Sequence, residues 1–208
     1  MEYFFAVVLF AISSSVTPGP NNIMVMTSGV NFGVRKSVPL LMGICIGFAI
    51  MLAMVGVGFG QLFNALPMLH LIIKTAGIGY LLYLSWLIAR SAAVMESNDN
   101  ARPLSFLKGV LFQWINGKAW VVATGAIAAF TSASGDYYYQ TAIVALTFFV
   151  VSFPCVGVWL LFGSGLKQVL AQPKHRKRFN YAMAILLALS VLPVAAELPR
   201  EWLGYSAA

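Results

Sequence analysis

Repeated apolar runs of about 20 residues restrict the fold of this chain more than any other feature of its sequence. A helix needs roughly 20 apolar residues to cross the ~30 Å hydrocarbon core of a bilayer. The runs lack the alternation of an outer-membrane barrel, so their backbone groups must be satisfied within helices. We therefore predict an all-α integral membrane protein with about six transmembrane helices. The predicted spans are Tyr3–Val30, Val38–Phe59, Met68–Ile88, Phe106–Phe130, Thr141–Phe162 and Phe179–Leu198.

Composition supports a membrane protein and argues against other classes. Hydrophobic residues make up 60% of the 208 residues and charged residues only 9%, beyond what a soluble core requires. The net charge of +7 does not indicate a nucleic-acid partner, because the basic residues lie between apolar runs rather than over a soluble surface. No cleavable signal peptide is evident, so we expect the first span to be retained and membrane lipid to be a partner.

The cysteines and histidines give no sign of a metal site or a cofactor. Cys45 and Cys155 both lie within apolar runs, which indicates neither a disulfide framework nor a zinc site. His70 and His175 are isolated and lack the spacing of metal ligands. We therefore expect no metal and no cofactor.

The basic residues predict an orientation, because ten of the 13 lie in or beside three alternating loops. Cytoplasmic loops of membrane proteins carry an excess of Lys and Arg. We predict that these loops are cytoplasmic and that both termini are periplasmic, in a bacterial inner membrane. The ten residues are Arg35, Lys36, Arg90, Arg102, Lys108, Lys167, Lys174, Arg176, Lys177 and Arg178.

A polar linker, residues 91–105, divides the chain into two halves, residues 1–90 and residues 106–208. Each half contains three predicted spans, and this odd number makes the second half enter the membrane from the opposite face. We therefore predict two inverted three-helix repeats, the plan of many secondary transporters. Because related halves share the features of their first span, helices one and four are both predicted to be broken.

The first predicted span is interrupted near its middle by the sequence VTPGPNN. Pro18 and Pro20 flank Gly19, and proline ends a helix because it lacks an N–H and clashes with the preceding turn. In lipid, a broken helix is tolerated only where its freed backbone groups face protein or a water-filled cavity. We expect the new helix start to attract a carboxylate, with Asn21 or Asn22 as its cap.

The fourth predicted span carries its own polar break, the sequence Asn116-Gly117-Lys118. Lys118 lies about 13 residues into this span, roughly 20 Å deep at 1.5 Å per residue and near the bilayer midplane. Its ammonium and the adjacent helix start would both attract a carboxylate. The predicted substrate-binding residues are Pro18, Gly19, Pro20, Asn21, Asn22, Asn116, Gly117 and Lys118.

Each break also has a purely structural interpretation. The Pro-Gly sequence can be a packing bend in a membrane helix. Lys118 can extend its ammonium to the cytoplasmic edge of the membrane, although a lysine at the centre of a span costs at least ~2.5 kcal/mol. These interpretations stay open at the level of the sequence.

Four motifs together resemble the LysE/RhtB superfamily of amino-acid exporters. They are TPGPNN in the first span, the loop at Gly33–Lys36, GIGYLLYLSW in the third span and QWINGKAW in the fourth. Members of this family usually carry Asn-Pro-Lys in the fourth span, where this chain has Gly117 in place of proline. The resemblance implies a transporter rather than an enzyme, which exports an amino acid or a close derivative from the cytoplasm and is driven by the proton gradient.

The positions of the acidic residues predict the class of amino acid. A lysine or arginine substrate adds a second cation in a low-dielectric site, and stabilising that cation ordinarily requires a buried carboxylate. All six acidic residues fall in loops, tails or span ends: Glu2, Glu96, Asp99, Asp136, Glu197 and Glu201. We therefore predict a small neutral amino acid or derivative of the threonine, homoserine, cysteine or leucine kind.

Two other functions are compatible with the sequence. The first is a membrane thiol-redox conduit that uses Cys45 and Cys155, although neither has a C-x-x-C partner and the two do not occupy equivalent positions in the halves. The second is a non-transporting membrane assembly factor, which leaves the interrupted spans and Lys118 without a role. The sequence also leaves open whether copies of the chain form a homo-oligomer.

Overall fold

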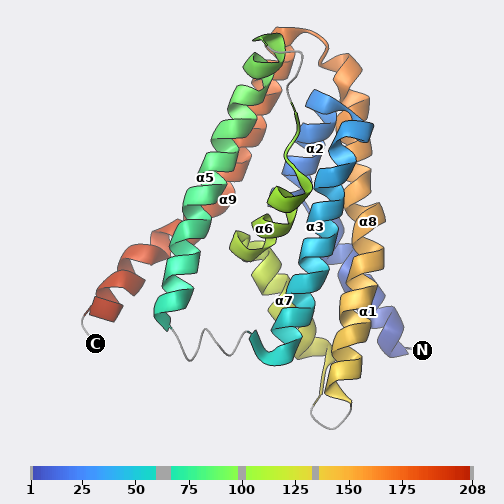
Figure 1. Cartoon of the computed structure of the whole chain (residues 1–208), viewed down its shortest axis with the longest axis vertical. Helices are drawn as coiled ribbons and strands as arrows, with labels where there is room; N and C mark the ends of the chain where they lie inside the picture. The colour runs from blue at the N-terminus through green and yellow to red at the C-terminus, as the bar shows by residue number, and fades with distance from the viewer. Residues whose placement is uncertain (1, 60–66, 98–101, 133–135, 207–208) are drawn as a thin grey trace.

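The computed structural model describes residues 2–59, 67–97, 102–132 and 136–206. Within these ranges the chain is helical apart from short connections and contains no strand (Figure 1). The predicted all-α class is confirmed. The elements are α1 (Glu2–Val16), α2 (Pro20–Phe32), α3 (Val34–Met54), the π-helical η1 (Val55–Phe59), α5 (Pro67–Ser97), α6 (Phe106–Ile115), α7 (Gly117–Phe130), α8 (Tyr137–Val169) and α9 (Pro173–Ser206).

The lengths and compositions of the helices are those of a multi-pass membrane protein. In the described ranges, Val34–Gly58 and Tyr137–Val169 are each long and apolar enough to cross a bilayer, and α1 with α2 qualifies as a bent pair. Helices α6 and α7 are shorter apolar helices of 10 and 14 residues. Helices α5 and α9 contain 31 and 34 residues, more than the roughly 20 that a span requires. The six-span count and the inverted repeats stay predictions.

Several helices extend beyond the predicted spans. Helix α8 begins at Tyr137 because the Asp136 carboxylate caps it, accepting a hydrogen bond from the Tyr139 N–H at 3.0 Å. Helix α5 continues through Ala92 and Ala93 into the predicted linker, since alanine favours helix. Residues 98–101 of that linker lie outside the described ranges. Helix α9 begins at Pro173, a residue that suits the first helical position.

Two clusters of buried apolar side chains form the core. Figure 1 shows α5 and α9 as an antiparallel pair beside the other helices, and the first cluster joins this pair to them. Its members include Met24, Leu40, Ile44, Leu84, Phe112 and Leu187. The second cluster lies among α1, α3, α7 and α8. Its members include Val7, Met51, Ala123, Val144 and Phe148.

Glycine permits the closest contacts between helices. A Cβ atom added at Gly43 of α3 would overlap the Phe106 carbonyl group of α6. A Cβ atom added at Gly163 of α8 would overlap the Met26 carbonyl group of α2. Small residues of this kind let membrane helices approach closely. The two contacts fix α6 against α3 and α2 against α8, and thereby position one half of each broken span.

The basic segments gather at one end of the molecule. Figure 1 shows the α2–α3 junction, the C-terminal end of α5 and the α8–α9 junction at this end, with both chain termini toward the other end. These segments carry Arg35, Lys36, Lys167 and the basic run at residues 174–178. We call this the basic end. Residues 102–105 lead from it to the start of α6.

Candidate substrate-binding site

The first predicted break is present between α1 and α2, whose axes are bent by 56°. Helix α1 ends at Val16, and Gly19 stands before α2 in a fully extended conformation (φ −174°, ψ −179°). Pro20 occupies the first helical position, where its missing N–H has no intrahelical partner to lose. No side chain caps the start of α2. The prediction that Asn21 or Asn22 does so is wrong, because both follow Pro20 inside the helix and a capping side chain must precede it.

Side chains from other positions bind the carbonyl groups that the first break frees. The Asn22 Nδ2 atom donates hydrogen bonds to the Ser15 and Thr17 carbonyl oxygens, both at 3.0 Å. The Trp159 indole N–H of α8 donates to the Val16 carbonyl oxygen at 3.1 Å. Asn22 therefore stabilises the end of α1 rather than the start of α2.

Lys118 of α7 reaches across to the same break. Its Nζ atom donates to the Thr17 carbonyl oxygen at 2.8 Å and lies 3.5 Å from the Pro18 carbonyl oxygen. The carbonyl end of a helix attracts a cation. The Lys118 side chain passes over Gly19, where an added Cβ atom would lie only 2.9 Å from the lysine Cδ atom. An ammonium has three N–H donors, so two directed at these carbonyls leave one for a ligand.

The second predicted break is present between α6 and α7 and forms without a proline. Helix α6 ends at Ile115, Asn116 is extended (φ −85°, ψ 101°), and α7 begins at Gly117. The Trp120 indole N–H donates to the Trp114 carbonyl oxygen at 2.8 Å, a bond that ties the two sides of the break together. Glycine at this position is therefore sufficient for the helix to break.

Amide side chains join the two breaks to each other. Asn21 and Gln113 form a reciprocal pair, in which Asn21 Nδ2 donates to Gln113 Oε1 at 3.0 Å and Gln113 Nε2 donates to Asn21 Oδ1 at 3.1 Å. Asn116 Nδ2 also approaches Asn21 Oδ1, at 3.3 Å. Gln113 is fully buried and additionally donates to the Gly109 carbonyl oxygen at 3.1 Å. The two interrupted spans therefore meet in one hydrogen-bonded cluster.

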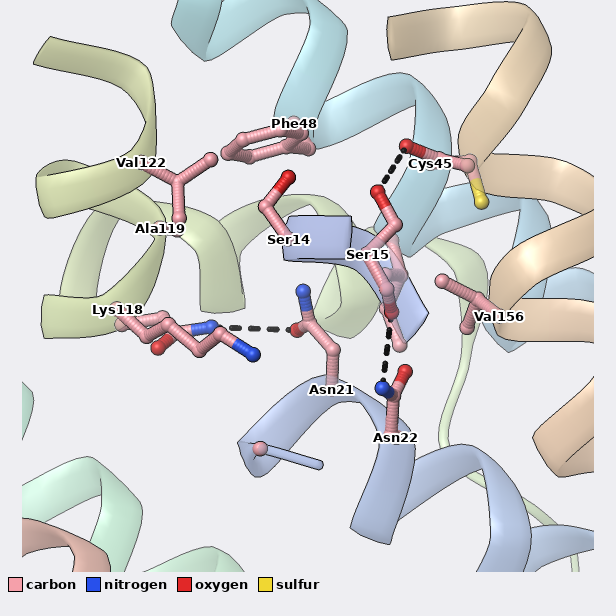
Figure 2. Close-up of a pocket in the computed structure, with 14 residues that line it drawn as sticks. Ser14, Ser15, Asn21, Asn22, Cys45, Phe48, Lys118, Ala119, Val122 and Val156 are labelled. Atoms are coloured by element: carbon pink, nitrogen blue, oxygen red, sulfur yellow. Dashed lines mark hydrogen bonds between the residues drawn. The ribbon is translucent and has the colours of Figure 1, made fainter. Parts of the chain in front are cut away.

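A cavity of about 50 Å³ lies between the breaks, and we call it the central cavity. Figure 2 shows Lys118 extending toward the start of α2, where Asn21 and Asn22 stand, with Ser14 and Ser15 of α1 nearby. The lining residues are Ser14, Ser15, Gly19, Asn21, Asn22, Ile44, Cys45, Phe48, Asn116, Lys118, Ala119, Val122, Ser152 and Val156.

Two buried oxygen atoms in this cavity wall have no hydrogen-bond partner in the described part of the chain. They are the Oδ1 atoms of Asn22 and Asn116, each in a side chain that is 2% exposed. A buried acceptor without a partner costs about 1–3 kcal/mol, and a donor from a ligand would remove that cost. Both residues line the cavity beside Lys118, so their unused acceptors would suit an ammonium if they become accessible to a ligand, and the Lys118 ammonium suits a carboxylate. No described Asp or Glu side chain lines it.

Five of the eight predicted site residues line the central cavity, and three do not. Gly19, Asn21, Asn22, Asn116 and Lys118 belong to its wall. Pro18, Pro20 and Gly117 are absent from the wall and instead shape the breaks that bring the other five together.

Sequence reasoning missed several polar residues of the site. Gln113 belongs to the QWINGKAW motif and is a lone amide in an apolar segment. This pattern could have indicated that Gln113 belongs to the site. Ser15 and Ser152 approach each other at 3.4 Å across the cavity, but small hydroxyl residues are common in membrane helices and carry little signal. Cys45 lines the cavity, whereas Cys155 does not, and both are free buried thiols.

Comparison with known proteins identifies what the chain is similar to. The sequence model of the LysE type translocator family matches residues 12–200. Cysteine/O-acetylserine efflux proteins of Escherichia coli (strain K12), Shigella sonnei (strain Ss046) and Shigella flexneri are each 28% identical to the chain over 180 residues. These matches cover 86% of this chain and 90% of each relative. No solved structure matches the chain significantly.

Proposed function

The chain belongs to the LysE type translocator family, and from this premise we propose that it exports a small neutral amino acid or a close derivative through the central cavity. Amino-acid efflux across a membrane is the activity that the family and the relatives support, and it is not an enzymatic activity. The thiol-redox and assembly-factor alternatives find no support in a family of translocators.

One observation carries the proposal: both helix breaks contribute polar groups of opposite character to the same small space. Lys118 supplies an ammonium, and the first-turn N–H groups of α2 and α7 are unpaired within their helices. Asn22 and Asn116 supply buried oxygen acceptors without partners in the described ranges. A zwitterionic amino acid presents one carboxylate and one ammonium, so its backbone matches this set.

The walls of the central cavity favour a neutral side chain. Ser14, Ser15 and Ser152 offer hydroxyl groups, and apart from Lys118 and the three asparagines the rest of the wall is apolar. A cationic side chain would need a buried carboxylate, and none lines the cavity among the described side chains. The relatives are named for cysteine and O-acetylserine, which are neutral zwitterions of this kind. O-acetylserine therefore joins threonine, homoserine, cysteine and leucine as a candidate.

The direction of transport follows from the orientation that we propose. The basic end faces the cytoplasm, as expected for loops rich in Lys and Arg, and both termini face the periplasm of a bacterial inner membrane. Proton entry drives efflux, which is the coupling that the family resemblance implies. In proteoliposomes, dissipating the proton gradient with an uncoupler should reduce efflux; an unchanged rate would contradict proton coupling.

Export from cells with matched internal amino-acid pools tests the substrate class. Cells that produce the protein are fed dipeptides, and the free amino acids appearing outside are measured against cells without it. Neutral amino acids should leave faster than lysine or arginine, because a second cation lacks a partner in the cavity. Selective export of lysine and arginine would show the charge argument to be wrong.

A further inference from the structure

A second and larger cavity, of about 220 Å³, lies toward the basic end. Its polar wall comes from the C-terminal half of α2 and from the segment that leads into α6. The relevant lining residues are Thr27, Ser28, Asn31, Arg102 and Lys108. It is about four times as large as the central cavity.

Thr27 has a hydroxyl group in this wall that is left without a partner. The residue is 3% exposed, and its Oγ1 atom makes no hydrogen bond with any described residue. Threonine in a helix commonly bonds to the carbonyl group four residues earlier. Thr75, Thr124 and Thr131 of this chain do so, at 2.7, 2.8 and 2.6 Å. Thr27 therefore keeps a buried hydroxyl donor that no described residue uses, in a residue that lines this cavity.

The other polar residues of α2 in this wall already have partners. Ser28 and Ser37 share a hydrogen bond of 2.7 Å between their hydroxyl oxygens. Asn31 and Asn180 of α9 form a reciprocal amide pair at 3.1 and 3.2 Å. These bonds hold α2 against α3 and α9, so they fix the position of Thr27 rather than compete for a ligand.

The charge of this cavity favours an anionic group. Arg102 and Lys108 contribute two cations, and no described Asp or Glu side chain lines the wall. Both basic side chains are exposed, so they attract a ligand from solution and their effect is screened by salt. The buried Thr27 hydroxyl adds a donor that has no partner among the described residues.

An apolar layer separates the two cavities. Met24, a buried residue one helical turn along α2 from Pro20, lines the basic-end cavity, whereas Ile44 lines the central cavity. Both belong to the first core cluster together with the fully buried Phe112. The two cavities share no lining residue. Helix α2 contributes to both walls, and Asn22 and Thr27 are five residues apart in sequence, about 7.5 Å along the helix axis.

We propose that the basic-end cavity is a vestibule site that binds the carboxylate of the amino acid before the amino acid passes the apolar layer to the central cavity. Thr27 donates a hydrogen bond to the carboxylate, and Arg102 and Lys108 provide charge. This inference rests on the proposed function, since it assigns a first binding site to the same substrate. The occupant is the amino acid itself rather than an anionic lipid headgroup.

Efflux kinetics of two variants test the vestibule site. The assay uses cells loaded with L-cysteine, L-threonine, L-homoserine and L-leucine, and it measures efflux against internal concentration. Thr27→Val keeps the shape and removes the hydroxyl, and it should raise the concentration for half-maximal efflux about tenfold at an unchanged maximal rate. The double variant Arg102→Gln/Lys108→Gln should raise the concentration for half-maximal efflux by a similar factor. Thr124→Val and Lys174→Gln/Lys177→Gln are the matched controls, because these residues line neither cavity.

A binding measurement separates this inference from the proposed function. In purified Lys118→Ala protein the central site is disabled, yet the same four amino acids should still bind weakly, and added salt should weaken that binding. Adding Thr27→Val should abolish it. No binding to the Lys118→Ala protein, or kinetics of Thr27→Val equal to those of Thr124→Val, would overturn the vestibule site while leaving the exporter intact. Competition by phosphatidylglycerol, but not by phosphatidylcholine, would assign the cavity to lipid instead.

Discussion

At the scale of single residues, Lys118 contacts the carbonyl end of α1 and is also the proposed partner of the substrate carboxylate. Its ammonium binds the carbonyl end of α1 in the present conformation, at 2.8 Å from the Thr17 carbonyl oxygen. A substrate carboxylate would compete for the same cation. If the substrate carboxylate binds Lys118 as proposed, occupation of the central cavity would weaken the contact between the two broken spans.

Replacing Lys118 should separate these roles. Lys118→Ala is expected to abolish efflux with normal abundance in the membrane, because both the carboxylate and the α1 carbonyl groups lose their cation. Lys118→Arg should restore efflux poorly, since a planar guanidinium does not replace a compact ammonium. Efflux and membrane abundance are measured together; wild-type efflux by the alanine variant would remove Lys118 from the site.

Gly19 provides a subtler test of the same geometry. Its backbone is extended rather than left-handed, so alanine adds no conformational strain. The new methyl group would lie 2.9 Å from Lys118 Cδ and displace that side chain. Gly19→Ala should therefore lower efflux severalfold at unchanged abundance. Gly125→Ala of α7 is the control, because a Cβ atom there meets open space; equal efflux by the two variants would mean that Lys118 tolerates the displacement.

At the scale of helices, the breaks work only because unbroken helices hold them in place. Helix α8 packs against α2, and the indole N–H of its Trp159 donates a hydrogen bond to the Val16 carbonyl oxygen at the end of α1. Helix α3 packs against α6, so each break lies beside a long apolar helix. The half-helices are too short to cross the bilayer alone and depend on these contacts for their positions.

The contact between α2 and α8 should be sensitive to a single methyl group. Gly163→Ala places a Cβ atom against the Met26 carbonyl group and forces the helices apart. We expect a loss of roughly 1–3 kcal/mol of stability, the range for overpacked cores, seen as a lower unfolding temperature in detergent. Gly165→Ala, two residues along the same helix, meets open space and should not lower the unfolding temperature, because alanine favours a helix over glycine. A similar drop in both variants would contradict the packing explanation.

At the scale of the whole molecule, three basic segments share one end and both termini lie toward the other. This arrangement agrees with an even number of crossings. With the basic end in the cytoplasm, the vestibule site faces the cell interior, where an exporter meets its substrate. The orientation of the chain therefore decides which cavity is loaded first.

Topology reporters test this orientation directly. A fusion after Ala207 should report a periplasmic C-terminus, and a fusion near Asn98 should report the cytoplasm, because basic loops are retained there. At each position two reporters are fused in turn, one that is active only in the periplasm and one that is active only in the cytoplasm. A cytoplasmic C-terminus would require an odd number of spans and would end the inverted-repeat prediction.

Much of the architecture can be predicted from local features of the sequence. Apolar length determined the helical class, because lipid leaves the backbone no other partner. Pro18 and Pro20 determined the first break through their missing N–H groups, and the polar Asn116-Gly117-Lys118 sequence indicated the second. The restriction of acidic residues to loops, tails and span ends supplied the expectation of a neutral substrate. The family resemblance was readable from four motifs, and the family match confirms it.

Contacts between distant segments were decided only by the tertiary structure. Asn22 was assigned to the start of α2 and instead binds the end of α1, whose freed carbonyl groups lie within hydrogen-bond distance of it across the bent break. Gln113 meets Asn21 across 92 residues of sequence. The Thr27 hydroxyl finds no partner among the described residues, whose other polar groups nearby bind one another. Sequence patterns report which groups a helix frees or buries. Which partner then satisfies each group depends on how the helices pack, and this packing is determined by contacts between residues that are far apart in the sequence.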